Sequence, residues 1–157
     1  MWMRFQLLGL TERIRPDMIR NLIAAFLGML AGMTVNMSLV LVALFCHPMP
    51  EGVDFTDTEA MPEYFATLPA TGFLVVLAAH LGQSFFGGLV AALLSKDRPR
   101  TMALIIGVLS LIGGVVNLTE LPHPTWMWIE VPGYLLAAWF AASLAMRLKR
   151  SSAATSA

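Results

Sequence analysis

Residues 21–46 read NLIAAFLGMLAGMTVNMSLVLVALFC and contain no charged side chain. As a helix this segment would rise about 39 Å, more than the hydrocarbon core of a bilayer, which is about 30 Å thick. Similar apolar stretches follow at 70–95, 101–119 and 126–146. Long runs rich in Leu, Ala and Met predict helices and not the alternating strands of a membrane barrel. We therefore predict an all-α membrane protein with a bundle of four transmembrane helices.

The composition agrees with this fold class. Hydrophobic residues make up 57% of the 157 residues and charged residues 13%, against about 25% charged in a typical soluble domain. The net charge is zero, so the sequence predicts no nucleic-acid partner. Cys46 is the only cysteine, which excludes an intrachain disulfide and a cysteine-based zinc site. The first apolar run is too long for a signal-peptide core, so we expect it to remain as a membrane anchor.

The charged side chains are strongly segregated along the chain. All Lys and Arg precede the first span, separate the second from the third, or follow the fourth: Arg4, Arg13, Arg15, Arg20, Lys96, Arg98, Arg100, Arg147, Lys149 and Arg150. In a four-span chain these three places lie on one side of the membrane. The other side receives only acidic residues: Glu51, Asp54, Asp57, Glu59, Glu63 and Glu120. Basic loops stay in the cytoplasm, so both termini are predicted to be cytoplasmic.

This pattern divides the chain into three parts. Residues 1–16 form an N-terminal cytoplasmic segment, either an amphipathic helix on the membrane surface or a disordered basic tail. Residues 17–147 hold the four-helix transmembrane domain. Residues 148–157, which end in Ser-Ser-Ala-Ala-Thr-Ser-Ala, are expected to be a disordered cytoplasmic tail.

Small residues recur at helical spacing in every span, which is typical of helices that pack closely in lipid. The stripes are Ala24, Gly28, Gly32 and Asn36; His80, Ser84, Gly88 and Ala92, with Gln83, Gly87 and Ala91 beside them; Gly107, Ser110, Gly114 and Asn117; and Ala137, Ala138, Ala141, Ala142 and Ala145. We expect these faces to point inward. Segments 32–36 and 113–117 both read Gly-x-x-x-Asn and both precede a Pro-x-Pro, which suggests two repeated helical hairpins.

The four spans each carry one strongly polar residue at nearly the same depth. Asn36, His80, Asn117 and Glu130 lie 16 or 17 positions from the basic residue that anchors their helix. At about 1.5 Å per residue they lie roughly 24–26 Å from the cytoplasmic surface. Polar groups at this depth need partners, so we predict a shared polar layer, with Gln83 beside it. It is either a ligand- or proton-binding site or a structural clasp between helices.

No catalytic triad, phosphate loop or metal motif is present, so we predict no catalytic residue, metal or cofactor. Three functions stay open for this membrane protein. The polar layer could bind a small ligand or proton. The chain could instead be a structural partner of other membrane proteins. Thirdly, it could act as an enzyme on a lipid or quinone, with His80 and Glu130 as acid and base. Beyond the lipid bilayer, the expected partners are a second copy of the chain or another membrane protein.

Several short motifs resemble those of a family of small four-helix proteins of the bacterial inner membrane. They are Asn36, Pro-Glu-Gly-Val-Asp at 50–54, Ala79-His80-x-Gly82, Gly87-Gly88, Gly113-Gly114-x-x-Asn117 and Pro124-Thr-Trp126. These motifs span most of the chain. The resemblance implies a multi-pass inner-membrane protein with this fold, and it implies no activity.

Overall fold

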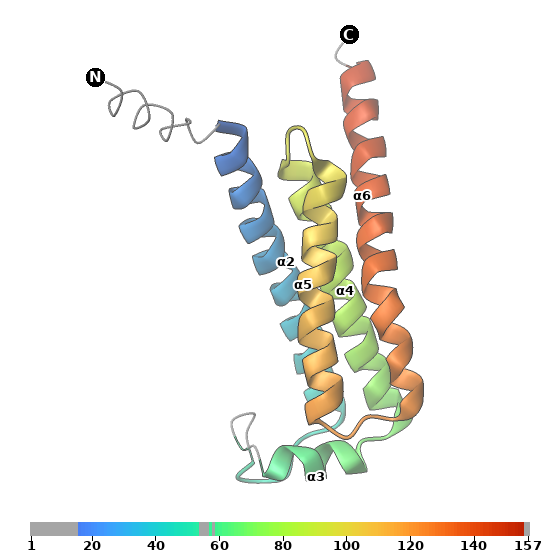
Figure 1. The fold of residues 1–157 in the computed structure, drawn as a ribbon. Helices are drawn as coiled ribbons and strands as arrows, with labels where there is room; N and C mark the ends of the chain where they lie inside the picture. The colour runs from blue at the N-terminus through green and yellow to red at the C-terminus, as the bar shows by residue number, and fades with distance from the viewer. Residues whose placement is uncertain (1–15, 54–56, 58, 156–157) are drawn as a thin grey trace, which may run out of the picture.

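A computed structural model describes residues 16–53, 57 and 59–155. Four long helices form a bundle: α2 (Pro16–Cys46), α4 (Ala70–Leu94), α5 (Pro99–Glu120) and α6 (Glu130–Thr155). All four are long and apolar enough to cross a membrane, and no strand occurs among the described residues. The prediction of an all-α, four-helix membrane protein is thus confirmed. The short helix α3 (Ala60–Thr67) lies across one end of the bundle, as Figure 1 shows.

The helices begin and end where the local sequence requires it. Pro16 and Pro99 stand at the first position of α2 and α5, where a helix needs no backbone N–H donor. Pro69 precedes α4, and Leu121, followed by Pro122, leaves α5 in an extended conformation. The 3₁₀ helix η1 (Thr125–Ile129) leads directly into α6. The first three predicted spans therefore match the observed helices to within five residues, whereas α6 runs nine residues past the predicted end of the fourth span at 146.

The C-terminal helix corrects one expectation. The tail over 148–157 was predicted to be disordered, but α6 continues to Thr155. Once a helix is nucleated, each further residue that is fixed adds one backbone hydrogen bond, so extension is favourable. Leu, Lys, Arg and Ala are also good helix formers. The hydroxyls of Ser152 and Thr155 also donate to the carbonyls four residues earlier. The prediction for the N-terminal segment falls on residues 1–15, outside the described residues.

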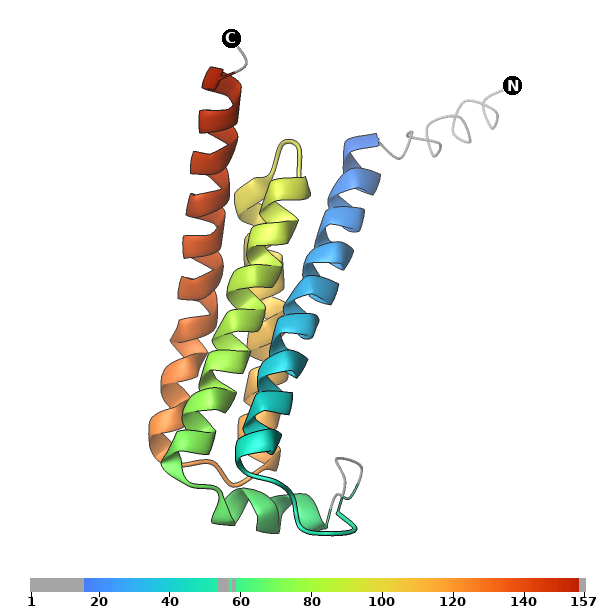
Figure 2. The ribbon, with the colours of Figure 1, turned by 180° about the vertical axis from the view of Figure 1, so that it is seen from behind.

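Helix α4 lies at the centre of the bundle and packs against α2, α5 and α6, while α2 packs chiefly against α4 (Figure 2). The predicted small-residue stripes are the contact faces. A methyl group on Gly28 of α2 would lie 2.6 Å from the carbonyl oxygen of Gly87 in α4. One on Gly107 of α5 would lie 2.6 Å from the Cβ of Ala138 in α6. Bulky side chains such as Phe26 point outward and are exposed. The predicted inward faces are thus buried.

A polar network joins the helices at the end where α2 begins, α4 ends, α5 begins and α6 ends, which we call the basic end. The side-chain amide of Asn21 donates to Asp97 over 3.1 Å and accepts from the hydroxyl of Ser95 over 2.9 Å. This amide hydrogen bond lowers the pKa of Asp97 below its usual value. Arg20 donates to the carbonyl of Leu94 over 3.0 Å, so α2 is tied to the end of α4.

Candidate functional site

The opposite end of the bundle, which we call the acidic end, contains a buried chain of hydrogen bonds. Nδ1 of His80 in α4 lies 2.9 Å from Oε2 of Glu130, the first residue of α6. The hydroxyl of Tyr134 donates to Oε1 of the same carboxyl group over 3.2 Å. The hydroxyl of Ser84 donates to the Tyr134 carbonyl over 2.7 Å. Both oxygens of Glu130 therefore have partners, as a fully buried carboxyl group needs.

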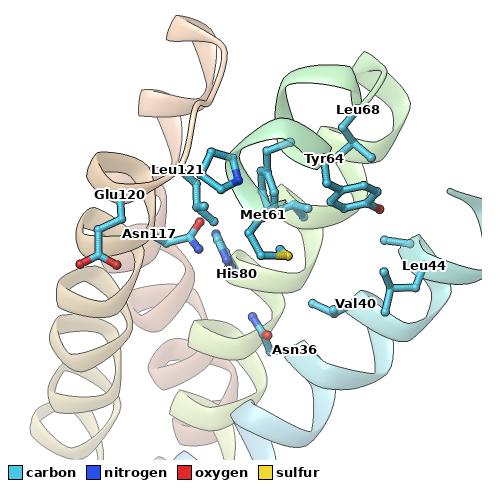
Figure 3. A pocket seen from close by; sticks show the side chains of 14 residues that line it. Asn36, Val40, Leu44, Met61, Tyr64, Leu68, His80, Asn117, Glu120 and Leu121 are labelled. Carbon is cyan, nitrogen blue, oxygen red and sulfur yellow. The ribbon is translucent and has the colours of Figure 1, made fainter. Parts of the chain in front are cut away.

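A cavity of about 690 Å³ lies beside this chain, between α2, α4 and α5 and beneath α3. Its polar lining includes Asn36, His80 and Asn117, one residue from each of the three long helices. In Figure 3 these side chains point into the cavity. Nδ1 of His80 is engaged by Glu130, which does not line the cavity itself. His80 is therefore the link between the cavity and the buried carboxyl group.

The two asparagines line the cavity, and their side chains have no hydrogen-bond partner in the part of the chain that the structure describes. No described group makes a hydrogen bond with the side-chain amide of Asn36 or of Asn117, and Oδ1 of Asn117 is buried. A buried polar atom without a partner costs about 1–3 kcal/mol, so such atoms are rare in native structures. The side-chain amides of both asparagines can thus form hydrogen bonds with a molecule in the cavity, and they do not join the helices to one another.

The rest of the cavity wall is mainly apolar and includes α3. Met61 of α3 is buried, and Phe65 packs edge-on against Phe73 of α4 with 6.2 Å between the ring centroids. The Tyr64 hydroxyl donates to the carbonyl of His47 over 2.7 Å, which holds α3 to the segment after α2. Burial raises the pKa of Tyr64, so its phenol stays protonated at neutral pH. The cavity therefore combines an apolar wall with a few polar groups that point into it.

Gln83 occupies a different place from the other polar residues. It lies about one helical turn from His80 toward the basic end and does not line the cavity. Its amide donates to Ser110 of α5 over 3.4 Å. The five predicted residues thus divide into three that line the cavity, one that supports His80 from behind, and one that joins α4 to α5.

Sequence reasoning missed Tyr134 and the contribution of α3. Tyr134 stands four positions after Glu130, and residues at this spacing share a helix face, so that signal was present. Nothing in the sequence showed that Met61, Tyr64 and Phe65 would cover the cavity. Glu120 also lines the cavity rim, but its carboxylate points away from the cavity in Figure 3.

No group of three or more His, Cys, Asp or Glu side chains within residues 16–53, 57 and 59–155 is arranged to hold a metal ion. His123 packs against Phe65 and Phe73 with centroid distances of 5.2 and 5.7 Å. Its Nδ1 donates to the carbonyl of Leu121 over 2.9 Å. We therefore assign His123 to the packing of the connection that precedes η1.

Comparisons of the chain with protein families, with curated proteins and with solved structures found no match. The resemblance to small four-helix proteins of the bacterial inner membrane thus stays a prediction from short motifs. Four apolar helices in one bundle identify the chain as an integral membrane protein that crosses the bilayer more than once.

Proposed function

We propose that the protein lies in the inner membrane of a bacterium with both termini in the cytoplasm. All ten Lys and Arg residues fall at the three sites that a four-span chain brings to one side. Basic loops are retained in the cytoplasm, whereas acidic residues contribute little to orientation. The start of α2, the α4–α5 connection and the end of α6 share the basic end of the bundle, which supports this orientation. The cavity then faces the outer side.

We also propose that the fold contains two repeated hairpins, α2 with α4 and α5 with α6. In each, the connection between the helices lies at the acidic end (Figure 1). Asn36 and Asn117 stand at matching places in the first helix of each hairpin, and both line the cavity. These matching asparagines support the repeat.

We propose that the cavity binds a small ligand and that His80 with Glu130 provides its proton-binding group. The observation that carries this proposal is a cavity of about 690 Å³ into which Asn36, His80 and Asn117 converge. Ligand pockets typically measure about 300–1,000 Å³ and combine apolar walls with a few placed polar groups. A layer that served only to clasp the helices would instead join these polar groups to one another.

The lining indicates the chemical class of the ligand. Val40, Leu44, Met61 and Phe65 suit an apolar body. Oδ1 of Asn117 accepts hydrogen bonds and Tyr64 is engaged with His47, so the ligand needs an O–H or N–H donor near Asn117. The best candidate is an amphipathic molecule with one polar end, small enough for a cavity of this volume.

The His80–Glu130 pair gives the site a way to bind a proton. The pair is neutral overall when it shares one proton, either as imidazolium with carboxylate or as imidazole with carboxylic acid. A second proton would make it cationic, and Tyr134 would still donate to the carboxyl group. Because Nδ1 faces Glu130, Nε2 of His80 is the atom through which a proton or a ligand can be exchanged with the cavity.

A pair of matched variants tests ligand binding. Ala43 lines the cavity and is 6% exposed, whereas its neighbour Val42 is 50% exposed. We expect Ala43→Phe to fill the cavity and Val42→Phe to leave it open. Molecules extracted from the purified full-length proteins would be compared by mass spectrometry. A compound retained by the wild type and by Val42→Phe should fall at least about tenfold in Ala43→Phe, which is about 1.4 kcal/mol in affinity.

The variant Asn117→Leu keeps the side-chain size and removes its hydrogen bonds. It should lower retention of the same compound while the protein stays folded, as judged by circular dichroism in detergent. If no compound copurifies with the wild type, or if every variant retains it equally, the cavity does not bind a ligand.

A structural clasp is the second interpretation, and it is favoured by the burial of Glu130 and by partners on both of its oxygens. The two interpretations differ for Glu130→Gln. The amide can still accept from Tyr134 and donate to His80, so the binding-site proposal expects a folded, inserted protein in which only ligand retention changes. Glu130→Ala should unfold more readily, by about 2–4 kcal/mol, because it leaves a void and an unpartnered phenol. If Glu130→Gln is degraded or misassembled, the clasp is the better account.

An assembly role has less support. The small-residue faces that could have bound a partner, such as the one with Gly28 and Gly32, are used inside the bundle against α4. A second copy of the chain or another membrane protein would have to bind the lipid-facing side chains or the acidic connection after α2. An enzyme acting on a lipid or quinone would rely on His80, since no other strong proton-transfer group among the described residues points into the cavity.

A further inference from the structure

A groove of about 570 Å³ lies near the basic end, far from the cavity described above. It is lined mainly by α6, with one residue from α4 and one from α5. Its lining residues are Phe85, Arg100, Trp139, Phe140, Ser143, Leu144, Met146, Arg147 and Arg150. The groove is thus lined by three arginines and by three aromatic residues.

These three arginines differ from the other described cations at the basic end. Lys96 lies 3.3 Å from Asp17, and Arg98 lies 3.8 Å from Asp97. Arg20 and Lys149 donate to the carbonyls at the end of α4. Within the described residues, no acidic side chain pairs with the three arginines of the groove, which are Arg100, Arg147 and Arg150. Their guanidinium groups are therefore available to an anionic partner outside the described residues.

The aromatic part of the groove lies below the charges along α6. Trp139 precedes Arg147 by eight positions, or about 12 Å of helix toward the acidic end. The side chains of Trp139 and Phe140 are 51% and 56% exposed, and their rings meet edge-on at 5.0 Å. The groove thus presents cations where the headgroups lie and flat apolar surfaces where the acyl chains begin.

We propose that this groove binds an anionic phospholipid in the membrane leaflet at the basic end. A guanidinium group presents paired N–H donors that match phosphate oxygens, and Arg100, Arg147 and Arg150 would together hold the headgroup phosphate. The acyl chains would lie over Trp139 and Phe140. Ser143 takes no part in phosphate binding because its hydroxyl already donates to the Trp139 carbonyl over 2.9 Å. This inference does not depend on the function of the cavity at the other end.

Fluorescence quenching tests the proposal on the full-length protein. The chain has four tryptophans, and replacing Trp2, Trp126 and Trp128 with Phe leaves Trp139 as the reporter. The protein would be reconstituted into phosphatidylcholine vesicles that contain a small fraction of phosphatidylglycerol with brominated acyl chains. Brominated phosphatidylcholine at the same fraction is the reference. We expect brominated phosphatidylglycerol to quench Trp139 far more strongly than its bulk fraction predicts.

Two double variants remove equal charge from the same end. Arg147→Gln with Arg150→Gln should weaken the preference for phosphatidylglycerol by about thirtyfold, or about 2 kcal/mol. Lys96→Gln with Arg98→Gln should change it less than about threefold, because those cations lie outside the groove and have acidic partners. Equal losses in both variants would show that the whole basic end attracts the lipid and would overturn the proposal. Equal quenching by both brominated lipids, or full reversal by inorganic phosphate, would also overturn it.

The single variant Arg100→Gln covers the case in which the double variant fails to insert. It removes one cation from α5 and leaves α6 unchanged. We expect a loss of about fivefold in the preference for phosphatidylglycerol, and an unchanged preference would contradict the assigned groove.

Discussion

Single atoms decide what the polar layer can do. Nδ1 of His80 is engaged by Glu130 at 2.9 Å, while Oδ1 of Asn117 is buried without a described donor. The first contact stabilises the junction of α4 and α6, and the second leaves hydrogen-bonding capacity for a ligand. The polar layer therefore joins helices α4 and α6 where Nδ1 of His80 meets Glu130. Where His80 lines the cavity, the layer leaves polar groups for a ligand.

At the residue scale, alanine substitutions at two neighbouring glycines of α5 should have opposite effects on stability. A methyl group on Gly114 would overlap the phenol oxygen of Tyr134, whereas no described atom lies within 4 Å of one on Gly113. We expect Gly114→Ala to destabilise the protein by about 1–3 kcal/mol, because Tyr134 is buried and would have to give up its hydrogen bond to Glu130 to make room. Gly113→Ala should be neutral or stabilising by up to about 1 kcal/mol through helix propensity. Unfolding in detergent measures both, and equal effects would contradict the packing of Tyr134 against α5.

At the scale of whole elements, helix α3 converts a gap between helices into a cavity. It contributes Met61 to the wall and ties itself to the end of α2 through Tyr64. Its eight residues would be marginal as an isolated helix, so it depends on these contacts and on the hydrogen bonds that Asp57 accepts from its first backbone N–H groups. From the sequence, Thr56 followed by Glu59 indicates a possible capping box for a short surface helix of about two turns in this acidic loop, and α3 is a helix of that length.

The carboxylate of Asp57 holds the start of α3 in place. Its Oδ1 accepts from the backbone N–H groups of Glu59 and Ala60 at 3.2 and 2.9 Å. We expect Asp57→Ala to destabilise α3 by about 1 kcal/mol, seen as hydrogen exchange of its amides accelerated about fivefold. Glu63→Ala, on the exposed side of the same helix, should leave exchange unchanged. Equal acceleration in both variants would mean that the cap does not hold α3 in place.

The described part of the molecule is asymmetric along its axis, with the cations at one end and most of the carboxylates, together with the cavity beneath α3, at the other. Of the ten Lys and Arg residues, the seven that the structure describes belong to the basic end. This asymmetry would place the cavity and the groove in opposite leaflets. The cavity would then take a ligand from outside, and the groove an anionic lipid from the cytoplasmic leaflet.

Cys46 allows the orientation to be tested at the whole-molecule scale. It is the only cysteine, is exposed, and lies 26 positions from Arg20, so it should sit about 39 Å along α2 and beyond the hydrocarbon core. A membrane-impermeant maleimide should label Cys46 in intact spheroplasts. In a Cys46→Ser background, Ser151→Cys should be labelled only after permeabilisation. The reverse pattern would overturn the proposed orientation and the assignment of leaflets.

The amino-acid sequence by itself determined the fold class, the four spans and their inward faces. It could do so because a bilayer demands long uncharged helices, and because close packing in lipid demands glycine and alanine at four-residue steps. Stretch 21–46 and the stripe through Gly28 and Gly32 carry this information without any long-range contact.

Only the tertiary structure decided which polar groups meet. Depth along a helix follows from counting residues, and that count brought His80 and Glu130 to one level. Which atoms touch depends on how each helix is rotated and where α3 lies, and both are set by side-chain packing between segments distant in the chain. For that reason the cavity and the buried Oδ1 of Asn117, which has no partner among the described residues, came from the structure. The extension of α6 to Thr155 instead follows from local helix propensity, which the expectation of a disordered tail underrated.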